Sequence, residues 1–263
     1  MRRSVDELTD DAITGDFRVW QRRRGHRYSL DDVATAWEAA RARPDAGRCL
    51  DLGCGLGSVL LMVAWKLPEA TLVGVEAQEV SFELVSRNVE RNRLAPRVTL
   101  HHGDLRDEAL VARLAEQPFD LITGTPPYRA PSDGPIPPDS QRAHARVELR
   151  GGVEDYLKTA GRLVASGGRV VVCAEARASE RALAGAAAAN LAPITQRDVV
   201  PRAGHKGPLF SVWTLARADE HDAPLVQVED LVVRDQGGAR TEQAHSLGWF
   251  FGLEPKLDEA PSP

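Results

Sequence analysis

Short apolar runs alternate with amphipathic segments along most of this chain, and the alternation limits the folds open to it. From residue 47 to residue 126 strands and helices are expected in turn, over residues 47–53, 58–67, 71–77, 80–92, 97–104, 107–117 and 119–126. Parallel strands are buried on both faces, so they read as continuous Val, Leu and Ile runs, and they need helical crossovers. The pattern therefore predicts a doubly wound, mostly parallel sheet of the Rossmann-like α/β class.

The second half of the chain completes this sheet. A Pro-, Gly- and Ser-rich loop leads to an expected helix over 152–165, a strand over 167–175 and an alanine-rich helix over 179–191. Two β-rich segments, 194–200 and 209–218, are joined by the loop PRAGHKGP and predict an antiparallel pair, which makes the sheet seven-stranded. We expect a short N-terminal extension over 1–40 that caps substrate and cofactor, the sheet domain over 41–252, and a flexible tail over 253–263.

The composition predicts a cytoplasmic location and argues against a membrane-spanning protein and a secreted protein. No run of 18 or more apolar residues occurs, and the N-terminal stretch MRRSVDELTDDAITGDF lacks the apolar core of a secretory signal. Cys49, Cys54 and Cys173 lie in apolar stretches without the spacing of metal ligands, as reduced core cysteines do. The sequence predicts a cytoplasmic globular protein with no membrane partner and no metal, and it does not fix an oligomeric state.

Three of the expected parallel strands end on residues that suit a nucleoside ligand. Gly53, Gly55 and Gly57 follow Asp51 in LDLGCGLGS, where glycines let the backbone turn tightly and approach a ligand. The dinucleotide fingerprint G-x-G-x-x-G fails here because Ser58 stands at its third glycine. Glu76 ends the next strand, where a carboxylate can accept both hydroxyls of a ribose. Asp104 ends the third strand, where its carboxylate can accept a hydrogen bond from the exocyclic amine of an adenine. Each feature alone is also typical of a turn or a solvated acid.

The fourth parallel strand ends unusually, in FDLITGTPPY. Pro126 and Pro127 cannot donate to a sheet ladder, and an aromatic ring, Tyr128, stands at the tip. One interpretation is a rigid turn after a strand; the other is a chemical site at the sheet edge.

The order of these motifs resembles that of the class I S-adenosylmethionine-dependent methyltransferases. Within that class, Thr125-Pro126-Pro127-Tyr128 resembles the Asn-Pro-Pro-Tyr signature of enzymes that methylate planar amino groups, namely adenine N6 and the glutamine side chain of release factors. The segments GHRYSLDDVATAW, PDSQRAHARVELRGGVEDYLKTA and EDLVVRDQGGARTEQAHSLGWF are similar to the bacterial enzymes that methylate an adenine beside the anticodon of a valine tRNA. The resemblance covers nearly the whole chain.

The resemblance implies S-adenosylmethionine as cofactor and assigns roles to residues. It implies cofactor binding by a set of eight residues: Asp31, Asp51, Gly53, Gly55, Gly57, Glu76, Asp104 and Leu105. It also implies that the Thr125 side chain and the Pro126 carbonyl accept the two amine hydrogens, that Pro127 contacts the substrate and that Tyr128 stacks on an extruded base.

Thr125 departs from the signature, because an asparagine stands there in the family. A threonine hydroxyl is shorter than the amide, and it accepts a substrate N–H best while it donates its own proton elsewhere. Hydroxyl residues precede Pro-Pro-Tyr in some cytosine N4 methyltransferases, which usually carry their motifs in another order.

A cluster of arginines bears on the substrate. The net charge is −5, yet Arg22, Arg23, Arg24 and Arg27 lie together near the N-terminus, as a solvated surface or as contacts to an anionic substrate. The leading hypothesis is therefore a tRNA adenine-N6 methyltransferase. The alternatives are an enzyme for another amine, in a protein side chain or a small molecule, and an RNA-binding module that has lost catalysis.

Overall fold

The computed structural model describes residues 7–254. Its elements, in chain order, are β1 Leu8–Ala12, β2 Arg18–Arg22, α1 Leu30–Ala42, β3 Arg48–Leu52, α2 Ser58–Lys66, β4 Thr71–Glu76, α3 Glu79–Arg91, β5 Val98–His102, α4 Glu108–Ala115, β6 Phe119–Gly124, α5 Ser140–Arg146, α6 Val153–Leu163, β7 Val164–Glu175, α7 Ser179–Ala188, β8 Leu191–Val200, β9 Phe210–Arg217, β10 Val226–Gln227, β11 Leu231–Val232 and α8 Glu242–Phe250. Within this range no helix is long and apolar enough to cross a bilayer.

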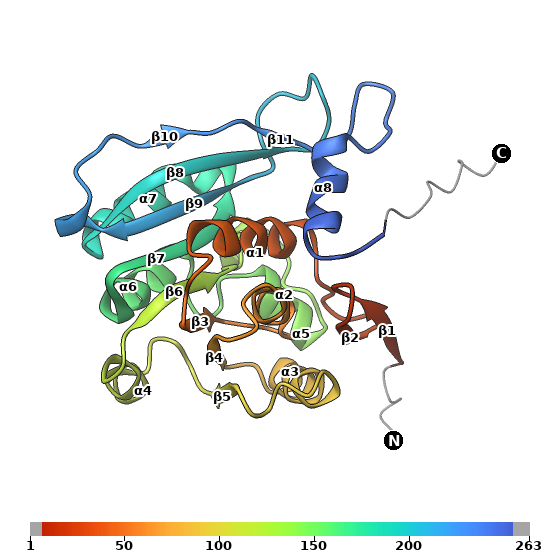
Figure 1. Ribbon diagram of the computed structural model, residues 1–263. Coiled ribbons are helices and arrows are strands. Elements are labelled where there is room, and N and C mark those ends of the chain that lie inside the picture. The colour runs from red at the N-terminus through yellow and green to blue at the C-terminus, as the bar shows by residue number, and fades with distance from the viewer. Residues whose placement is uncertain (1–6, 255–263) are drawn as a thin grey trace.

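The doubly wound, mostly parallel sheet is confirmed. The strands run in the order β10-β8-β9-β7-β6-β3-β4-β5, as Figure 1 shows from top to bottom, and β11 also pairs with β8. The pairs from β7 through β6, β3 and β4 to β5 are parallel, while β9 is antiparallel to both β7 and β8. Within the described residues the sheet has nine strands, because two two-residue strands join the expected seven at the β8 edge.

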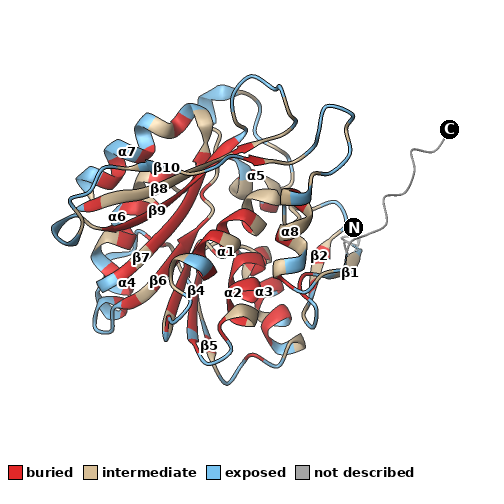
Figure 2. Cartoon of the chain, turned by 45° about the horizontal axis from the view of Figure 1, so that its top comes forward, coloured by how far each residue is buried: buried red, intermediate tan, exposed pale blue. Residues whose placement is uncertain are grey.

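Helices cover both faces of the sheet, and alternate residues along each central strand supply the two cores. On one face, Cys49 of β3 and Leu72 of β4 pack with α1, α2, α3 and α8. On the other, Leu50 and Val73, their neighbours in sequence, pack with α4, α6 and α7. Figure 2 shows the strands buried between these layers. The carboxyl ends of four parallel strands therefore meet at one edge, held between two packed cores.

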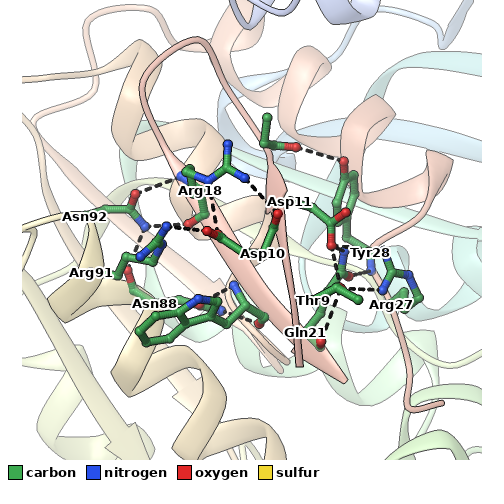
Figure 3. Close-up of polar contacts among 12 residues, drawn as sticks. Thr9, Asp10, Asp11, Arg18, Gln21, Arg27, Tyr28, Asn88, Arg91 and Asn92 are labelled. Atoms are coloured by element: carbon green, nitrogen blue, oxygen red, sulfur yellow. Dashed lines mark hydrogen bonds and ion pairs between the residues drawn. The ribbon is translucent and has the colours of Figure 1, made fainter. Parts of the chain in front are cut away.

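A β-hairpin outside the sheet, made of β1 and β2, is fixed to α3 by two asparagines one helical turn apart (Figure 3). The side-chain amide of Asn88 bonds both backbone groups of Trp20, at 2.7 and 3.0 Å, and that of Asn92 does the same for Arg18. Asn88 is fully buried and also donates to the Leu56 carbonyl in the loop before α2. Two side chains thus act as the strand partner that β2 lacks on this side.

Gly161 of α6 offers a test of the packing on the second face. A Cβ at this position would lie 2.2 Å from the backbone carbonyl oxygen of Ala189, whereas one at Gly248 of α8 would meet nothing nearer than 3.8 Å. We expect Gly161→Ala to lower the free energy of unfolding by roughly 1–3 kcal/mol through overpacking. The matched Gly248→Ala should leave it unchanged or raise it by up to about 1 kcal/mol, since alanine is the better helix former. Urea unfolding of both variants measures the difference, and equal effects would contradict the close packing of α6.

Candidate active site

A pocket of about 880 Å³, including its open mouth, lies at the carboxyl ends of β3, β4, β5 and β6. We call it the first pocket. It brings together seven of the residues singled out from the sequence: Gly53, Gly55, Glu76, Asp104, Leu105, Thr125 and Pro127.

Glycine is required in the loop between β3 and α2. Gly55 has a φ of +57°, and its N–H donates to Glu76 Oε2 at 2.8 Å. A Cβ at Gly55 would meet no atom within 4 Å, so the backbone there borders open space. Gly57 has a φ of +91° and packs against Val85 of α3, where a Cβ would lie 2.8 Å from Cγ2. Gly57 does not line the pocket, so its part in the site is to let α2 and α3 approach.

Glu76 is the buried acid of the first pocket. Besides the bond from Gly55, its Oε1 accepts the backbone N–H of Gln78 at 2.6 Å. Burial raises the pKa of this carboxyl, and the two backbone donors oppose the rise. The carboxylate is thus oriented by the backbone, and each oxygen keeps a lone pair for a ligand.

Asp51 lies behind the pocket rather than in its wall. It is buried, and its Oδ1 accepts the Thr123 hydroxyl of the neighbouring strand at 2.8 Å. Its Oδ2 has no hydrogen-bond partner among the described residues. Burial raises the pKa of the Asp51 carboxyl to about 7. The sequence analysis grouped Asp51 with residues that contact the cofactor, whereas the geometry gives it a contact across β3 and β6.

Asp104 and Leu105 follow β5 and line the pocket. Asp104 contributes its carboxylate, and Leu105 is buried. Both Asp104 oxygens accept from the Arg106 guanidinium, at 2.9 and 2.7 Å, and this contact lowers the pKa of Asp104. The Leu105 carbonyl accepts from Thr159 of α6 at 2.9 Å.

A second pocket of about 590 Å³, including open space, adjoins the first. Its wall includes the whole strand end, Thr125-Pro126-Pro127-Tyr128, together with Asp31 and Arg146. The two pockets share five lining residues: His26, Asp32, Thr125, Pro127 and Ala145. The strand end therefore stands where two pockets meet.

The first turn of α1 holds two residues of this strand end. Thr125 Oγ1 donates to Asp32 Oδ1 at 3.3 Å, and the Tyr128 hydroxyl donates to Asp31 Oδ2 at 3.2 Å. Asp31 thus lies in the second pocket, beside Tyr128, and does not line the first. The sequence analysis missed Asp32, although Ser29-Leu30-Asp31-Asp32 has the spacing of a capping box, which the structure contains.

The Tyr128 ring is partly covered. It lies near Phe210, with ring centroids 6.5 Å apart, and its hydroxyl is 3.1 Å from Cys173 Sγ. Burial raises the pKa of the phenol well above its usual value, so the hydroxyl stays protonated and can donate to Asp31.

The N-terminal arginines do not line either pocket. Arg22 pairs with Asp139 at 2.7 Å, Arg23 with Glu7 at 3.0 Å and Arg27 with Asp11 at 3.0 Å, the last visible in Figure 3. Arg24 is exposed. Instead the cations of the pocket walls are Arg146 and Arg150, and neither has a carboxylate within ion-pairing distance in the part of the chain described. The sequence analysis did not single them out, because they are scattered between α5 and α6.

Residues 32–186, more than half of the chain, match the model of the family described as methyltransferase small domain. The chain belongs to this methyltransferase small-domain family. S-adenosylmethionine is the cofactor of this family and of this chain.

The curated relatives of this chain act on different substrates. A tRNA1(Val) (adenine(37)-N6)-methyltransferase of Porphyromonas gingivalis is 32% identical over 140 residues, 52% of this chain and 53% of that protein. A ribosomal protein uL3 glutamine methyltransferase of Bradyrhizobium diazoefficiens is 34% identical over 154 residues, 58% and 41% of the two chains. A release factor glutamine methyltransferase of Geobacter sulfurreducens is 38% identical over 116 residues, 44% and 38%. The chain spans about half the length of the first of these relatives and less of the others.

Solved structures agree on the fold. A predicted O-methyltransferase from Agrobacterium tumefaciens superposes with a TM-score of 0.65 at 20% identity, over 87% of this chain and all of that one. A putative RNA methyltransferase from Pyrococcus horikoshii gives 0.51 at 15% identity, over 74% and 88%. This chain therefore shares its Rossmann-like architecture with both.

Proposed function

We propose that this chain transfers a methyl group from S-adenosylmethionine to a planar amino nitrogen, and that the nitrogen is N6 of an adenine in RNA. The observation that carries the proposal is the position of Thr125 and Pro127 at the junction of the two pockets. A cofactor in the first pocket and a flat amine in the second would meet beside the Thr125-Pro126 strand end.

The donor and acceptor set of the first pocket fits the cofactor. Glu76 offers a buried, backbone-held carboxylate to ribose hydroxyls, while Asp104 and the backbone of Leu105 can bind an adenine edge. The open space beside Gly55 leaves room for a ligand against the backbone. S-adenosylmethionine supplies an electrophilic methyl group on a sulfonium.

The second pocket suits the chemistry of an aromatic amine. Such a nitrogen is a poor nucleophile, because its lone pair is delocalised, and it must become tetrahedral as it attacks. Two acceptors aimed at its N–H groups favour that change more in the transition state than in the ground state. In this proposal the acceptors are Thr125 Oγ1 and the Pro126 carbonyl, which the Pro-Pro pair holds rigidly. Pro127 and Tyr128 would contact the flat ring.

The described part of the N-terminal extension supports a capping role. We propose that residues 1–40 cover substrate and cofactor, since His26, Tyr28 and Asp32 all line the first pocket. The methyltransferase domain proper would then comprise residues 41–252. In the proposed tail, 253–263, Leu253 and Glu254 belong to the described residues and the remainder lies outside them.

An unpaired cation of the second pocket favours RNA as the substrate. Arg146 is exposed, lines the second pocket and has no carboxylate partner among the described residues. Phosphate groups are the natural partners of such guanidinium groups. A glutamine side chain is the second candidate, because it also presents a planar amine, two of the relatives named above carry that activity, and Arg22, Arg23 and Arg27 are already paired.

Arg146 gives a direct test of phosphate contact. We expect Arg146→Gln to weaken tRNA binding and to lower the slope of log K against log salt by about 1, because one fewer counterion is released. Arg23→Gln is the matched control, since Arg23 is exposed but pairs with Glu7 away from the pockets. Fluorescence anisotropy over a salt series measures both slopes. Identical slopes for parent and Arg146→Gln would exclude a phosphate contact there.

The substrate class can be decided by direct labelling. Total RNA, protein and small-molecule extracts from a strain lacking the enzyme are incubated with the protein and S-adenosylmethionine labelled in its methyl group. We expect label in RNA, recovered as N6-methyladenosine after digestion. Label in protein as methylglutamine would replace the RNA proposal by its alternative. No label in any fraction would contradict amine methylation itself.

A further inference from the structure

We propose that Asp32 completes the site at Thr125, as the acceptor that orients its hydroxyl and as the group that finally takes the proton lost by the methylated amine. The inference rests on the proposed transfer to a planar amine and names a residue to which neither the family signature nor the sequence analysis gives a role. Thr125 with Asp32 would then replace the single asparagine of the signature.

The hydrogen-bond geometry supports this first step. A hydroxyl has one proton and two lone pairs. Because Thr125 Oγ1 donates its proton to Asp32 Oδ1 at 3.3 Å, its lone pairs remain for a substrate N–H. Without such a partner the hydroxyl could turn its proton toward the amine and repel it. Asp32 lines both pockets and is buried, with 6% of its surface exposed, so it reaches the reacting region without being solvated as a surface acid.

Asp32 is held in place by the start of α1. Its Oδ2 accepts the backbone N–H of Ser29 at 2.9 Å, which is one half of the capping box, and this leaves Oδ1 to Thr125. The adjacent acid, Asp31, bonds Tyr128 instead. The two carboxylates therefore have separate partners on one strand end, and the capping box fixes which oxygen of Asp32 faces Thr125.

The charge environment makes Asp32 a base suited to neutral pH. Burial, and then the charge of Asp31, raise the pKa of Asp32 to about 8, while the Ser29 N–H opposes the rise. Groups of several elements face it: Asp31 on α1, Asp51 on β3, Ser58 on α2, Cys173 on β7, Tyr28, the His26 imidazole, whose pKa is lowered by burial, and Arg146 of the second pocket. A catalytic base is most effective when its pKa lies near the working pH.

The proton balance closes with the residues present. A bond forms between the amine nitrogen and the methyl carbon as the carbon–sulfur bond breaks, so the positive charge moves from sulfur to nitrogen. The nitrogen then loses one N–H proton to Thr125 Oγ1, while the Thr125 proton passes to Asp32 Oδ1. Asp32 becomes a neutral carboxylic acid, Thr125 is restored, and the open second pocket lets the proton leave to solvent.

Asp32→Asn tests the inference with little change of shape. The asparagine oxygen can still accept the Ser29 N–H, so its NH₂ group would face Thr125 and donate to it. We expect a fall of about 100- to 1,000-fold in the single-turnover rate, with the S-adenosylmethionine dissociation constant, measured by calorimetry, within about threefold of the parent. The parent rate should fall tenfold per pH unit below the pKa of Asp32 and level off above it. The variant should lose this pH dependence.

Two further variants distinguish proton transfer through Thr125 and Asp32 from a purely structural role of Asp32. Asp107→Asn, which changes the N-cap acid of α4, a residue that lines neither pocket, should keep the parent rate and pH profile. Thr125→Val should itself flatten the profile, and adding Asp32→Asn to it should cost little more, because both changes break one chain. This measurement remains available if Asp32→Asn folds poorly.

The outcomes distinguish this inference from the function on which it rests. The role of Asp32 would be overturned if Asp32→Asn reacted at the parent rate, or if Thr125→Val kept the parent pH dependence. It would also be overturned if the losses of rate in the double variant were additive. Each of these results would leave amine methylation intact. If the parent protein methylates no amine in any of the labelled fractions, the proposed function itself fails.

Discussion

Thr125→Val should lower kcat by roughly ten- to a thousandfold and leave the affinity for S-adenosylmethionine nearly unchanged. Valine keeps the shape of threonine and removes the hydroxyl, and with it the acceptor for one substrate N–H. That interaction strengthens only as the nitrogen becomes tetrahedral, so its loss appears in kcat rather than in binding. Steady-state kinetics on the labelled substrate class, with calorimetry for the cofactor, measure the two quantities.

The control and the reverse substitution sharpen this prediction. Thr71→Val removes a threonine hydroxyl from the opposite end of the sheet, at the start of β4, and should turn over like the parent. Thr125→Asn should retain or raise activity on adenine because it restores the family acceptor, whereas a site shaped around another amine should lose activity through crowding. If both Thr125→Val and Thr125→Ala react at the parent rate, the strand end is a rigid turn without a catalytic role.

Glu76→Ala should weaken S-adenosylmethionine binding by about 1–3 kcal/mol, a factor of roughly 5 to 150. The carboxylate is held by the N–H groups of Gly55 and Gln78, so its loss removes charge-assisted bonds to the ligand and also disorders the glycine loop. Calorimetry gives the dissociation constant. Glu79→Ala, an exposed acid three residues later at the start of α3, should bind like the parent. Unchanged affinity for S-adenosylmethionine in folded Glu76→Ala would remove Glu76 from the site. If the parent itself did not bind S-adenosylmethionine, the alternative of an RNA-binding module without catalysis would be favoured.

The central fold was predictable because it depends on local patterns. Buried parallel strands need continuous apolar runs, and α2, α3, α4, α6 and α7 lie within or close to the expected ranges. The missed elements lack such patterns. β1 is LTDDA, a polar strand that pairs with β2 and whose Asp10 is ion-paired to Arg18 of β2 and Arg91 of α3, and α5 is a seven-residue polar helix. The two-residue strands β10 and β11 are too short to show any period.

The site was predictable where it follows from the sheet. Glu76, Asp104 and Thr125 end parallel strands, and such ends must meet. Asp32, Arg146 and Arg150 come from the N-terminal helix and from the α5–α6 region, and no local pattern brings them to the same edge. The N-terminal arginines show the converse, because clustered charge in a sequence does not reveal the carboxylates that neutralise it in three dimensions.

The buried amide of Asn88 has a consequence for where this protein can be divided. It satisfies backbone groups of β2 on one side and of the glycine loop on the other, so the hairpin and the cofactor loop share one interior hydrogen-bond centre. Deleting residues 1–40 would remove both Trp20 partners of that amide and leave it only the bond to the Leu56 carbonyl beside Gly55. A boundary near residue 40 therefore separates segments of sequence and not autonomous folding units. Fragments, fusions and circular permutants that detach the hairpin should lose the loop's order together with it.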